Sequence, residues 1–276
     1  MMRRAALIAG VALMVSNPSL AAAPRIASMN VCTDQLLLSL ADASQIAGLS
    51  PYARDEWQSW RAGDARKFPL LSGGAEDILM LRPDVVVASL FDKRATRELL
   101  RQNGVDLAEF SVPRTMAEVK AQLVRMGEIT GHADRADAGI ARLDAAARHA
   151  RAALANRGER VLPLSRRGWV FGRDSLTGAL LQEAGLRNAA DELGLIDGGF
   201  ASLEAIIALK PDLLLVSEEG DRAEDEGTAF LLHPALERFY PLSKRVVMPE
   251  RFTVCGGVML ADALDRLVEE MKRVGK

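Results

Sequence analysis

Seven of the thirteen aromatic residues in this 276-residue chain gather in a few loops. Each loop follows a segment that the sequence predicts to be a strand, and open α/β sheets bind ligands beyond the carboxyl ends of their strands. Large planar side chains offer contact area at a low entropic cost, which suits a bulky ligand. We expect about half of the seven to contact a ligand and the others to pack beneath their own loops. The seven are Tyr52, Trp57, Trp60, Phe91, Trp169, Phe171 and Phe252.

Arginine is the second residue type concentrated in these loops. Its planar guanidinium group binds carboxylates and related oxygen groups through paired hydrogen bonds. A cleft lined by several arginines would therefore favour an anionic ligand. An alternative that the sequence leaves open is pairing with neighbouring acids such as Asp55, Asp92 and Asp174. The candidate ligand-binding arginines are Arg54, Arg94, Arg173 and Arg251, and Arg114 lies in a loop of the same kind.

The sequence shows no pattern that would place a catalytic or metal-binding centre among these residues. It contains no G-x-S-x-G, P-loop, dinucleotide-binding or H-E-x-x-H motif, so we predict no catalytic residue, no resident cofactor and no enzymatic activity. The three histidines, His132, His149 and His233, form no recognisable set of ligands for a directly bound metal ion.

Two cysteines allow at most one internal disulfide bond. Cys32 and Cys255 lie near opposite ends of the chain, each between a short apolar stretch and a helix-like segment. A bond between them requires Cα atoms within about 7 Å of each other. The sequence leaves open whether they form this bond or remain two partly buried thiols.

The first 21 residues have the three parts of a secretory signal peptide. Arg3 and Arg4 precede the uncharged apolar residues 5–15, and Ser19-Leu20-Ala21 supplies small residues at the expected cleavage site. The apolar run is shorter than the roughly 20 residues that a membrane-spanning helix needs. We therefore predict export to a bacterial periplasm. The formal net charge of −2 leaves no basic excess for binding nucleic acid.

An internal repeat organises the rest of the chain. Residues 76–89 (EDILMLRPDVVVAS) match residues 204–217 (EAIIALKPDLLLVS) at a constant offset of 128, with six identities in fourteen positions. Each copy predicts a short helix that ends before proline, a turn at aspartate, and an apolar strand buried on both faces, as in a parallel sheet. Two copies predict an α/β fold with two similar lobes, each built on a parallel central sheet.

Helical sequence without the composition of a flexible linker separates the two copies. Residues 116–129 predict one helix, which ends at Gly131, and residues 133–156 predict a longer one that would span about 36 Å. We predict an N-terminal lobe over residues 22–115, a helical connection with one long backbone helix over 116–157, and a C-terminal lobe over 158–276. We also expect short strands at residues 168–172 and 252–254.

This organisation resembles the substrate-binding proteins of ABC importers for iron–siderophore complexes, haem and cobalamin. The resemblance rests on residues 25–30 (RIASMN), on the two E-x-I-x-x-L-[RK]-P-D segments, on residues 113–118 and on Thr130-Gly131 before the long helix. It extends over essentially the whole mature chain. It implies a periplasmic protein, expected to be a monomer, that holds its ligand in a shallow cleft between the two lobes, while a rigid helix limits closure of the lobes.

The resemblance also implies partners. In this family a surface glutamate of each lobe docks against arginines of the membrane permease, and by motif these residues are Glu76 and Glu204. An alternative is that each is a helix N-terminal acid favoured by the helix dipole. The implied partners are an ABC permease and ATPase complex and a small metal chelate, with a ferric siderophore or similar large chelate as the expected cargo. Cobalamin and haem are alternative cargoes, and Tyr52 or Met116 could serve as an axial ligand if the cargo is haem. A periplasmic α/β enzyme or a sensor is a more distant alternative.

Overall fold

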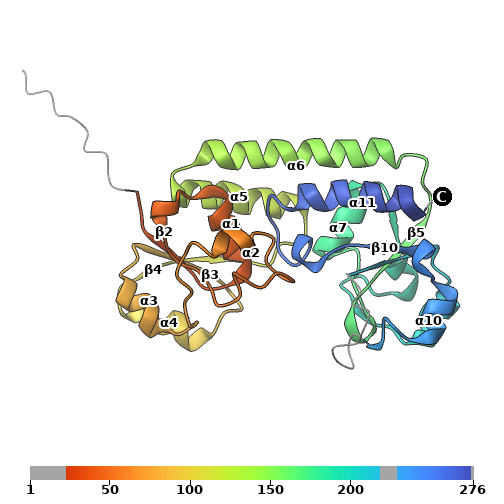
Figure 1. Cartoon of the computed structure of the whole chain (residues 1–276), viewed down its shortest axis with the longest axis horizontal. Helices are drawn as coiled ribbons and strands as arrows, with labels where there is room; N and C mark the ends of the chain where they lie inside the picture. Colours follow the sequence, from red (N-terminus) through yellow and green to blue (C-terminus); the bar gives the residue numbers. More distant parts are fainter. Residues whose placement is uncertain (1–22, 218–228, 275–276) are drawn as a thin grey trace, which may run out of the picture.

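The computed structural model describes residues 23–217 and 229–274. The expected signal peptide therefore lies outside the described residues. Figure 1 shows two lobes side by side beneath a layer of helices. Within the described ranges, no helix combines the length and apolar character that crossing a membrane requires.

The N-terminal lobe is built on a four-stranded sheet in the order β2-β1-β3-β4, and every pair in it is parallel. Val86, Val87 and Ala88 in β3 are fully buried, as expected for a strand with both faces covered. The elements of this lobe are β1 (Ile26–Ser28), α1 (Val31–Leu40), β2 (Ile46–Gly48), α2 (Ala62–Ala65), α3 (Ala75–Leu81), β3 (Val85–Ser89), α4 (Arg94–Gln102) and β4 (Asp106–Phe110).

The C-terminal lobe contains a second sheet in the order β10-β9-β5-β6-β8, with β7 also paired to β5. Its elements are β5 (Arg160–Leu164), β6 (Trp169–Val170), α7 (Leu176–Glu183), β7 (Arg187–Asn188), β8 (Gly199–Phe200), α8 (Leu203–Leu209), β9 (Leu213–Val216), α10 (Pro234–Phe239), β10 (Arg245–Val247) and α11 (Leu260–Val274).

This second sheet is mixed rather than wholly parallel. The pairs among β5, β7, β9 and β10 are parallel, but β6 pairs antiparallel with both β5 and β8. The connection from β5 to β6 explains this direction. It is only a few residues long, whereas a parallel crossover needs about a dozen or more. The expected strand at 168–172 is thus shortened to β6.

The prediction of a strand at residues 252–254 is wrong. A 3₁₀ turn over Glu250–Phe252 occupies this region. The backbone amides of Thr253 and Val254 both donate to the carbonyl of Glu250, so the chain curls on itself and offers no extended edge for pairing.

Each copy of the internal repeat forms the same helix-turn-strand unit. Helices α3 and α8 both end at a residue in the left-handed region, Arg82 at φ 46° and Lys210 at φ 49°. The proline that follows disfavours helical geometry at this residue, which explains why both helices end there. The central strands β3 and β9 then begin two residues after the proline.

An arginine–aspartate clamp, which the sequence reasoning missed, closes each unit. In the N-terminal lobe, the backbone N–H of Arg25 donates to Asp84 over 2.7 Å, and the Arg25 guanidinium donates to the last carbonyl of α3. In the C-terminal lobe Arg160 makes the equivalent bonds to Asp212, over 2.8 Å, and to the last carbonyl of α8. An arginine at the start of the first strand of each lobe, just before β1 and as the first residue of β5, therefore satisfies a helix end that would otherwise lack partners.

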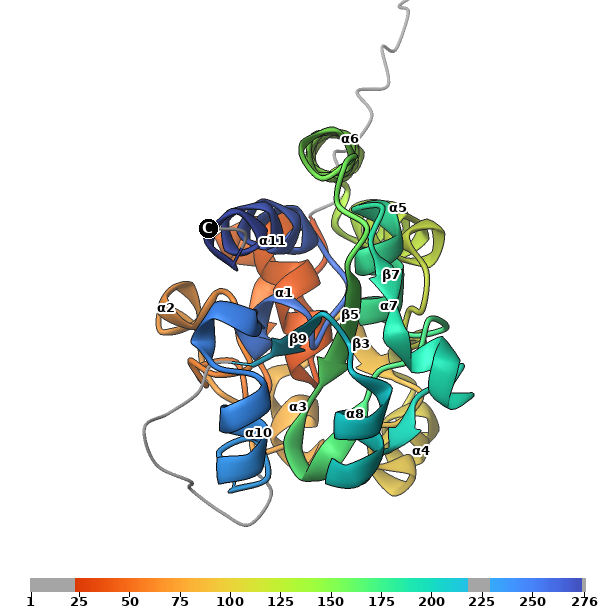
Figure 2. The same ribbon diagram turned by 90° about the vertical axis from the view of Figure 1, so that its right-hand side faces the viewer.

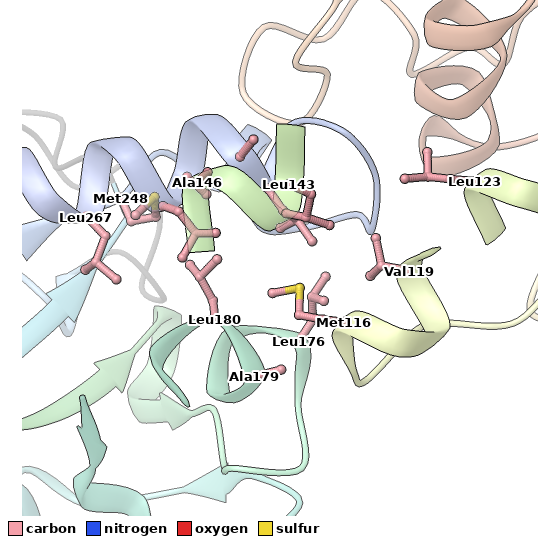
Figure 3. Packing of buried hydrophobic residues seen from close by; sticks show 14 of the residues in the cluster. Met116, Val119, Leu123, Leu143, Ala146, Leu176, Ala179, Leu180, Met248 and Leu267 are labelled. Atoms are coloured by element: carbon pink, nitrogen blue, oxygen red, sulfur yellow. The ribbon is translucent and has the colours of Figure 1, made fainter. Parts of the chain in front are cut away.

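The two lobes share one helical layer. Helix α5 (Met116–Thr130) begins at a capping box formed by Thr115 and Glu118 and ends at Gly131, whose φ is 76°. Helix α6 (Ala133–Ala153) then spans about 31 Å and lies across both lobes in Figure 1. Figure 3 shows side chains of α5, α6, α7 and α11 meeting in one apolar cluster. This continuous core ties the orientation of the lobes to the helical layer.

A second crossing joins the lobes just before α11. Cys255 in this segment is bonded to Cys32 in the first turn of α1. The next residue, Gly256, lies so close to the N-terminal lobe and to helix α5 that a Cβ atom there would fall 2.5 Å from Pro113 and 2.9 Å from Val119. The lobes are therefore linked by the long helix and also by this packed, cross-linked segment.

Candidate functional site

A cavity of about 640 Å³ lies between the two lobes, among the residues that the structure describes. Its walls are the loops that follow β1, β3 and β4 in one lobe and β5, β9 and β10 in the other. Carboxyl ends of strands thus converge on the cavity from both sides, as an open α/β sheet predicts. The apolar residues around it include Leu36, Phe110, Leu164, Leu176 and Leu215.

The disulfide bond forms part of the cavity wall. The Cα atoms of Cys32 and Cys255 are 5.1 Å apart, and both residues line the cavity. Asn30 caps α1 by accepting hydrogen bonds from the amides of Cys32 and Thr33, each over 3.0 Å. This cap fixes the first turn of α1, so the disulfide is held at a defined place beneath the cleft.

Three of the seven predicted aromatic side chains line the cavity, namely Phe91, Trp169 and Phe171. Phe91 follows β3 and is 80% exposed, so a ligand between the lobes could bury it. Trp169 stands edge-on to Phe200, with ring centroids 5.0 Å apart. Phe200 does not itself line the cavity, but its contact holds the Trp169 ring in a defined orientation at the C-terminal wall.

The loop after β2 lies apart from the cavity. Residues 50–69 form an excursion that returns to its start, because the amide of Leu49 donates to Pro69 and the amide of Leu71 donates to Leu49. Arg54 donates to the carbonyl of Phe68 over 2.7 Å within this excursion. For Tyr52, Arg54, Trp57 and Trp60, ligand contact stays a prediction, since none of them lines the cavity.

The other predicted arginines also have local partners. Arg94 pairs with Glu98 one helical turn away, and Arg173 lies 3.6 Å from Asp174 and 3.8 Å from Asp191. The turn before α11 directs Arg251 and Phe252 to a separate, smaller hollow beside α11. Of the arginines and lysines that the structure describes, Arg114 alone lines the main cavity.

The cavity instead presents carboxylates and small polar groups, which the sequence reasoning had not assigned to the ligand. Asp92, Asp174, Asp197 and Glu250 all line it. Asp92 accepts hydrogen bonds from the amide of Ser89 over 2.7 Å and from the side chain of Asn30 over 2.9 Å. Each of these carboxylates lies in a loop near a strand end, which is the signal that could have identified them.

The profile of a family described as "Periplasmic binding protein" matches residues 26–241. The chain belongs to this family. The resemblance inferred from the repeat and the helical connection is therefore confirmed at the level of the family. Because the members are binding proteins, the prediction that the chain is not an enzyme is confirmed as well. Among curated proteins no match is found.

Solved structures of periplasmic binding proteins share this fold at low sequence identity. The periplasmic heme-binding protein RhuT from Roseiflexus sp. RS-1 is 22% identical, with a TM-score of 0.71 over 91% of this chain and 98% of that one. An ABC-type Fe³⁺-hydroxamate transport system protein from Saccharomonospora viridis is 19% identical, with a TM-score of 0.69 over 90% and 93%. The periplasmic vitamin B12 binding protein BtuF of Vibrio cholerae is 15% identical, with a TM-score of 0.68 over 92% and 98%.

Glu76 and Glu204 occupy equivalent surface positions of this periplasmic binding protein. Each is exposed and lies in the first turn of its helix, α3 or α8. In Figure 2 both helices lie on the side of the molecule away from α6. Hydrogen bonds from its own backbone amide and from Ser202 lower the pKa of Glu204. The helix N-terminal role is therefore present in the structure and is compatible with a second role in docking.

Asp34 is a buried acid beside the cavity. Its carboxylate accepts the amide of Ser50 over 3.0 Å and the Ser50 hydroxyl over 2.5 Å. Burial raises the pKa of Asp34 to about 7, against the lowering effect of these hydrogen bonds. Folded protein thus holds a proton on Asp34 at pH values where the unfolded chain, with a pKa near 3.8, has released it.

Replacing Asp34 by Asn is expected to flatten the pH dependence of stability. A raised folded-state pKa contributes stability below pH 4 that is lost as the pH rises through about 7, a change of up to about 4 kcal/mol. Asn has the same shape and cannot ionise. Urea unfolding of both proteins at pH 4.5, 6.0 and 7.5 measures the effect. If the unfolding free energies of the wild type and the variant change with pH in the same way across this range, Asp34 does not titrate as described.

Proposed function

We propose that this protein captures a large metal chelate in the cavity between its lobes, as a monomer in the periplasm, and delivers it to an ABC importer. The cavity itself is the observation that supports this most. Its volume lies within the roughly 300–1,000 Å³ of small-molecule pockets, and both lobes supply its apolar and aromatic walls. The similar structures named above bind heme, belong to Fe³⁺-hydroxamate transport or bind vitamin B12, which are all metal-bearing cargoes.

Contacts to both lobes provide a physical route from binding to delivery. A ligand shifts the population toward a closed form only through contacts that are stronger in that form. Phe91 on one wall and Trp169 and Phe171 on the other are placed to supply them. The exposed ion pair between Arg114 and Asp197, at 3.1 Å, already spans the lobes at the rim but contributes little by itself.

Delivery would use the two exposed glutamates. Glu76 and Glu204 are related by the internal repeat, so the permease could contact one glutamate on each lobe at the same time. Charged contacts of this kind set the register and the rate of encounter. Hydrolysis of ATP would take place on the separate ATPase subunits of the importer.

Chelate binding is expected to quench the fluorescence of Trp169 specifically. Trp57 serves as the matched control because it is 53% exposed and does not line the cavity. Titration with a ferric trihydroxamate, a ferric tricatecholate, haem and cobalamin should show quenching in the Trp57→Phe variant and its loss in Trp169→Phe. Trp169→Ala should weaken affinity by about tenfold or more, because a buried aromatic contact is worth at least 1–2 kcal/mol.

Two results would count against this proposal. Failure of every chelate to bind the folded protein by calorimetry would remove the function itself. Quenching that disappears in Trp57→Phe and persists in Trp169→Phe would move the site to the loop after β2 and restore the first prediction for Tyr52, Trp57 and Trp60.

A further inference from the structure

We infer that the cleft selects a neutral or cationic chelate whose metal is already fully coordinated when it arrives. This inference rests on the proposed function and specifies the class of its cargo. It reverses the expectation of an anionic ligand, which depended on arginines that the structure places elsewhere. Two independent features of the cavity support it, the sign of its charged groups and the residue types that are absent from its wall.

The charged groups that face the cavity are mainly negative. Four carboxylates line it against one guanidinium group, that of Arg114, within the described part of the chain. Arg114 is paired with Asp197 at the exposed rim, and Asp174 has Arg173 3.6 Å away. Asp92 and Glu250 have no Lys or Arg partner within 4 Å among the described residues, and they stand on opposite lobes.

These two carboxylates act on a ligand through a predominantly apolar enclosure. A ligand that fills the cleft would displace water from between the Leu, Phe and Trp side chains of its walls, which would strengthen the effect of a fixed charge on that ligand. An anionic chelate would lose its hydration there without gaining a cation in exchange. A neutral chelate meets no such repulsion, and a cationic one is attracted from both lobes.

Apart from the carboxylates, which are not grouped to hold a metal ion, the described cavity wall offers no side chain that would complete the coordination of an iron atom. No His or Tyr lines it within the described ranges, and both cysteines are consumed in the disulfide. Met248 lines it but is only 2% exposed and belongs to the core cluster. No group of three or more His, Cys, Asp or Glu residues is arranged to hold a metal ion in the described chain. Tyr52 is 56% exposed outside the cavity, and Met116 is buried in the core.

The charge preference is tested with ferric chelates that differ in net charge. The wild-type protein is titrated by calorimetry with a neutral ferric trihydroxamate, a cationic ferric trihydroxamate and a trianionic ferric tricatecholate, at low and high salt. We expect the tricatecholate to bind at least about tenfold more weakly than either hydroxamate, since like charges brought together at an interface are strongly disfavoured. Added salt should weaken binding of the cationic chelate and leave the neutral one unchanged.

A charge-reversing variant supplies the decisive comparison. Glu250→Lys should bring the tricatecholate closer to the hydroxamates in affinity by about tenfold, whereas Glu128→Lys, an exposed position on α5 outside the cavity, should leave the order unchanged. Glu250→Gln removes the charge with little change in side-chain shape, so it separates the effect of the charge from any structural effect of lysine.

The outcomes separate this inference from the proposed function. Tighter binding of the tricatecholate than of the hydroxamates by the wild type would overturn the charge preference while leaving chelate capture intact. Binding of haem with the absorption spectrum of iron coordinated by a protein side chain would overturn the requirement for prior coordination. This result would also leave chelate capture intact. Absence of binding to all chelates would overturn the proposed function instead.

Discussion

Uptake of the cargo is expected to stop when Glu76 and Glu204 are both replaced by arginine, while affinity for the chelate stays unchanged. Reversing both charges would set arginine against the permease arginines that the family resemblance implies. Like charges at such a contact cost several kcal/mol and slow the encounter. Neither glutamate lines the cavity, so the ligand contacts are untouched.

This experiment needs a control for the number of reversed charges. Glu128→Arg with Asp137→Arg changes two exposed acids on the helical layer, on the side of the molecule away from α3 and α8. Cells that depend on the importer should take up the chelate with this control protein and fail with the double variant at positions 76 and 204. Glu76→Gln with Glu204→Gln should give an intermediate rate, because attraction is lost without repulsion being added.

The folded state of each variant is checked by circular dichroism and by chelate titration. Loss of a favourable acid at a helix N-terminus costs about 0.3–1 kcal/mol, which a folded protein of this size tolerates. Normal uptake by the variant with arginine at both positions would show that the two glutamates serve only their helices.

Removal of the disulfide bond is expected to have the largest effect on stability. Cys32 and Cys255 are 223 residues apart in sequence, so their bond restricts the unfolded chain severely. The chain-entropy treatment gives about 5 kcal/mol for a loop of this length. The Cys32→Ser, Cys255→Ser variant should therefore melt roughly 10–20 °C below the wild type, as measured by calorimetry.

Reductant provides the matched control within the same experiment. It should lower the melting temperature of the wild type to that of the double variant, and it should leave the variant unchanged. Equal stability of the oxidised wild type and the variant, within about 1 kcal/mol, would contradict the entropic account. Chelate affinity is measured in parallel, because both cysteines line the cavity and their bond holds the crossing segment against α1.

Local sequence signals predicted most of the elements because their causes are local. The Leu-Arg-Pro-Asp and Leu-Lys-Pro-Asp segments ended α3 and α8 where expected, since proline restricts the residue before it. Gly131 ended α5 because glycine adopts the left-handed conformation that this helix end requires. The strand expected at 252–254 was wrong because an apolar run forms a strand only where a neighbouring strand is free to pair with it.

The candidate site was harder to predict because it depends on which loops become neighbours. The strand-end rule selected the loop after β3, which holds Phe91, and residues 169–177, which hold Trp169 and Phe171, and both segments line the cavity. It also selected the loop after β2, but this strand is at the edge of its sheet, and residues 50–69 fold back on its end. The sequence could not show which charged side chains of these loops face the cavity. That depends on which arginines form ion pairs with neighbouring acids, and these pairs are known only from the structure.

The sequence by itself determined that this protein has two repeated α/β units and a rigid helical connection, and the order of its motifs made it resemble a family of binding proteins. The repeated units and the helical connection follow from hydrophobic periodicity and from helix-ending residues, both of which act over a few residues. Tertiary structure alone decided the bond between Cys32 and Cys255, the mixed second sheet and the excess of carboxylates that faces the cavity. Each of these depends on contacts between residues far apart in the chain, and their distances are set only when the lobes pack against the shared helical layer.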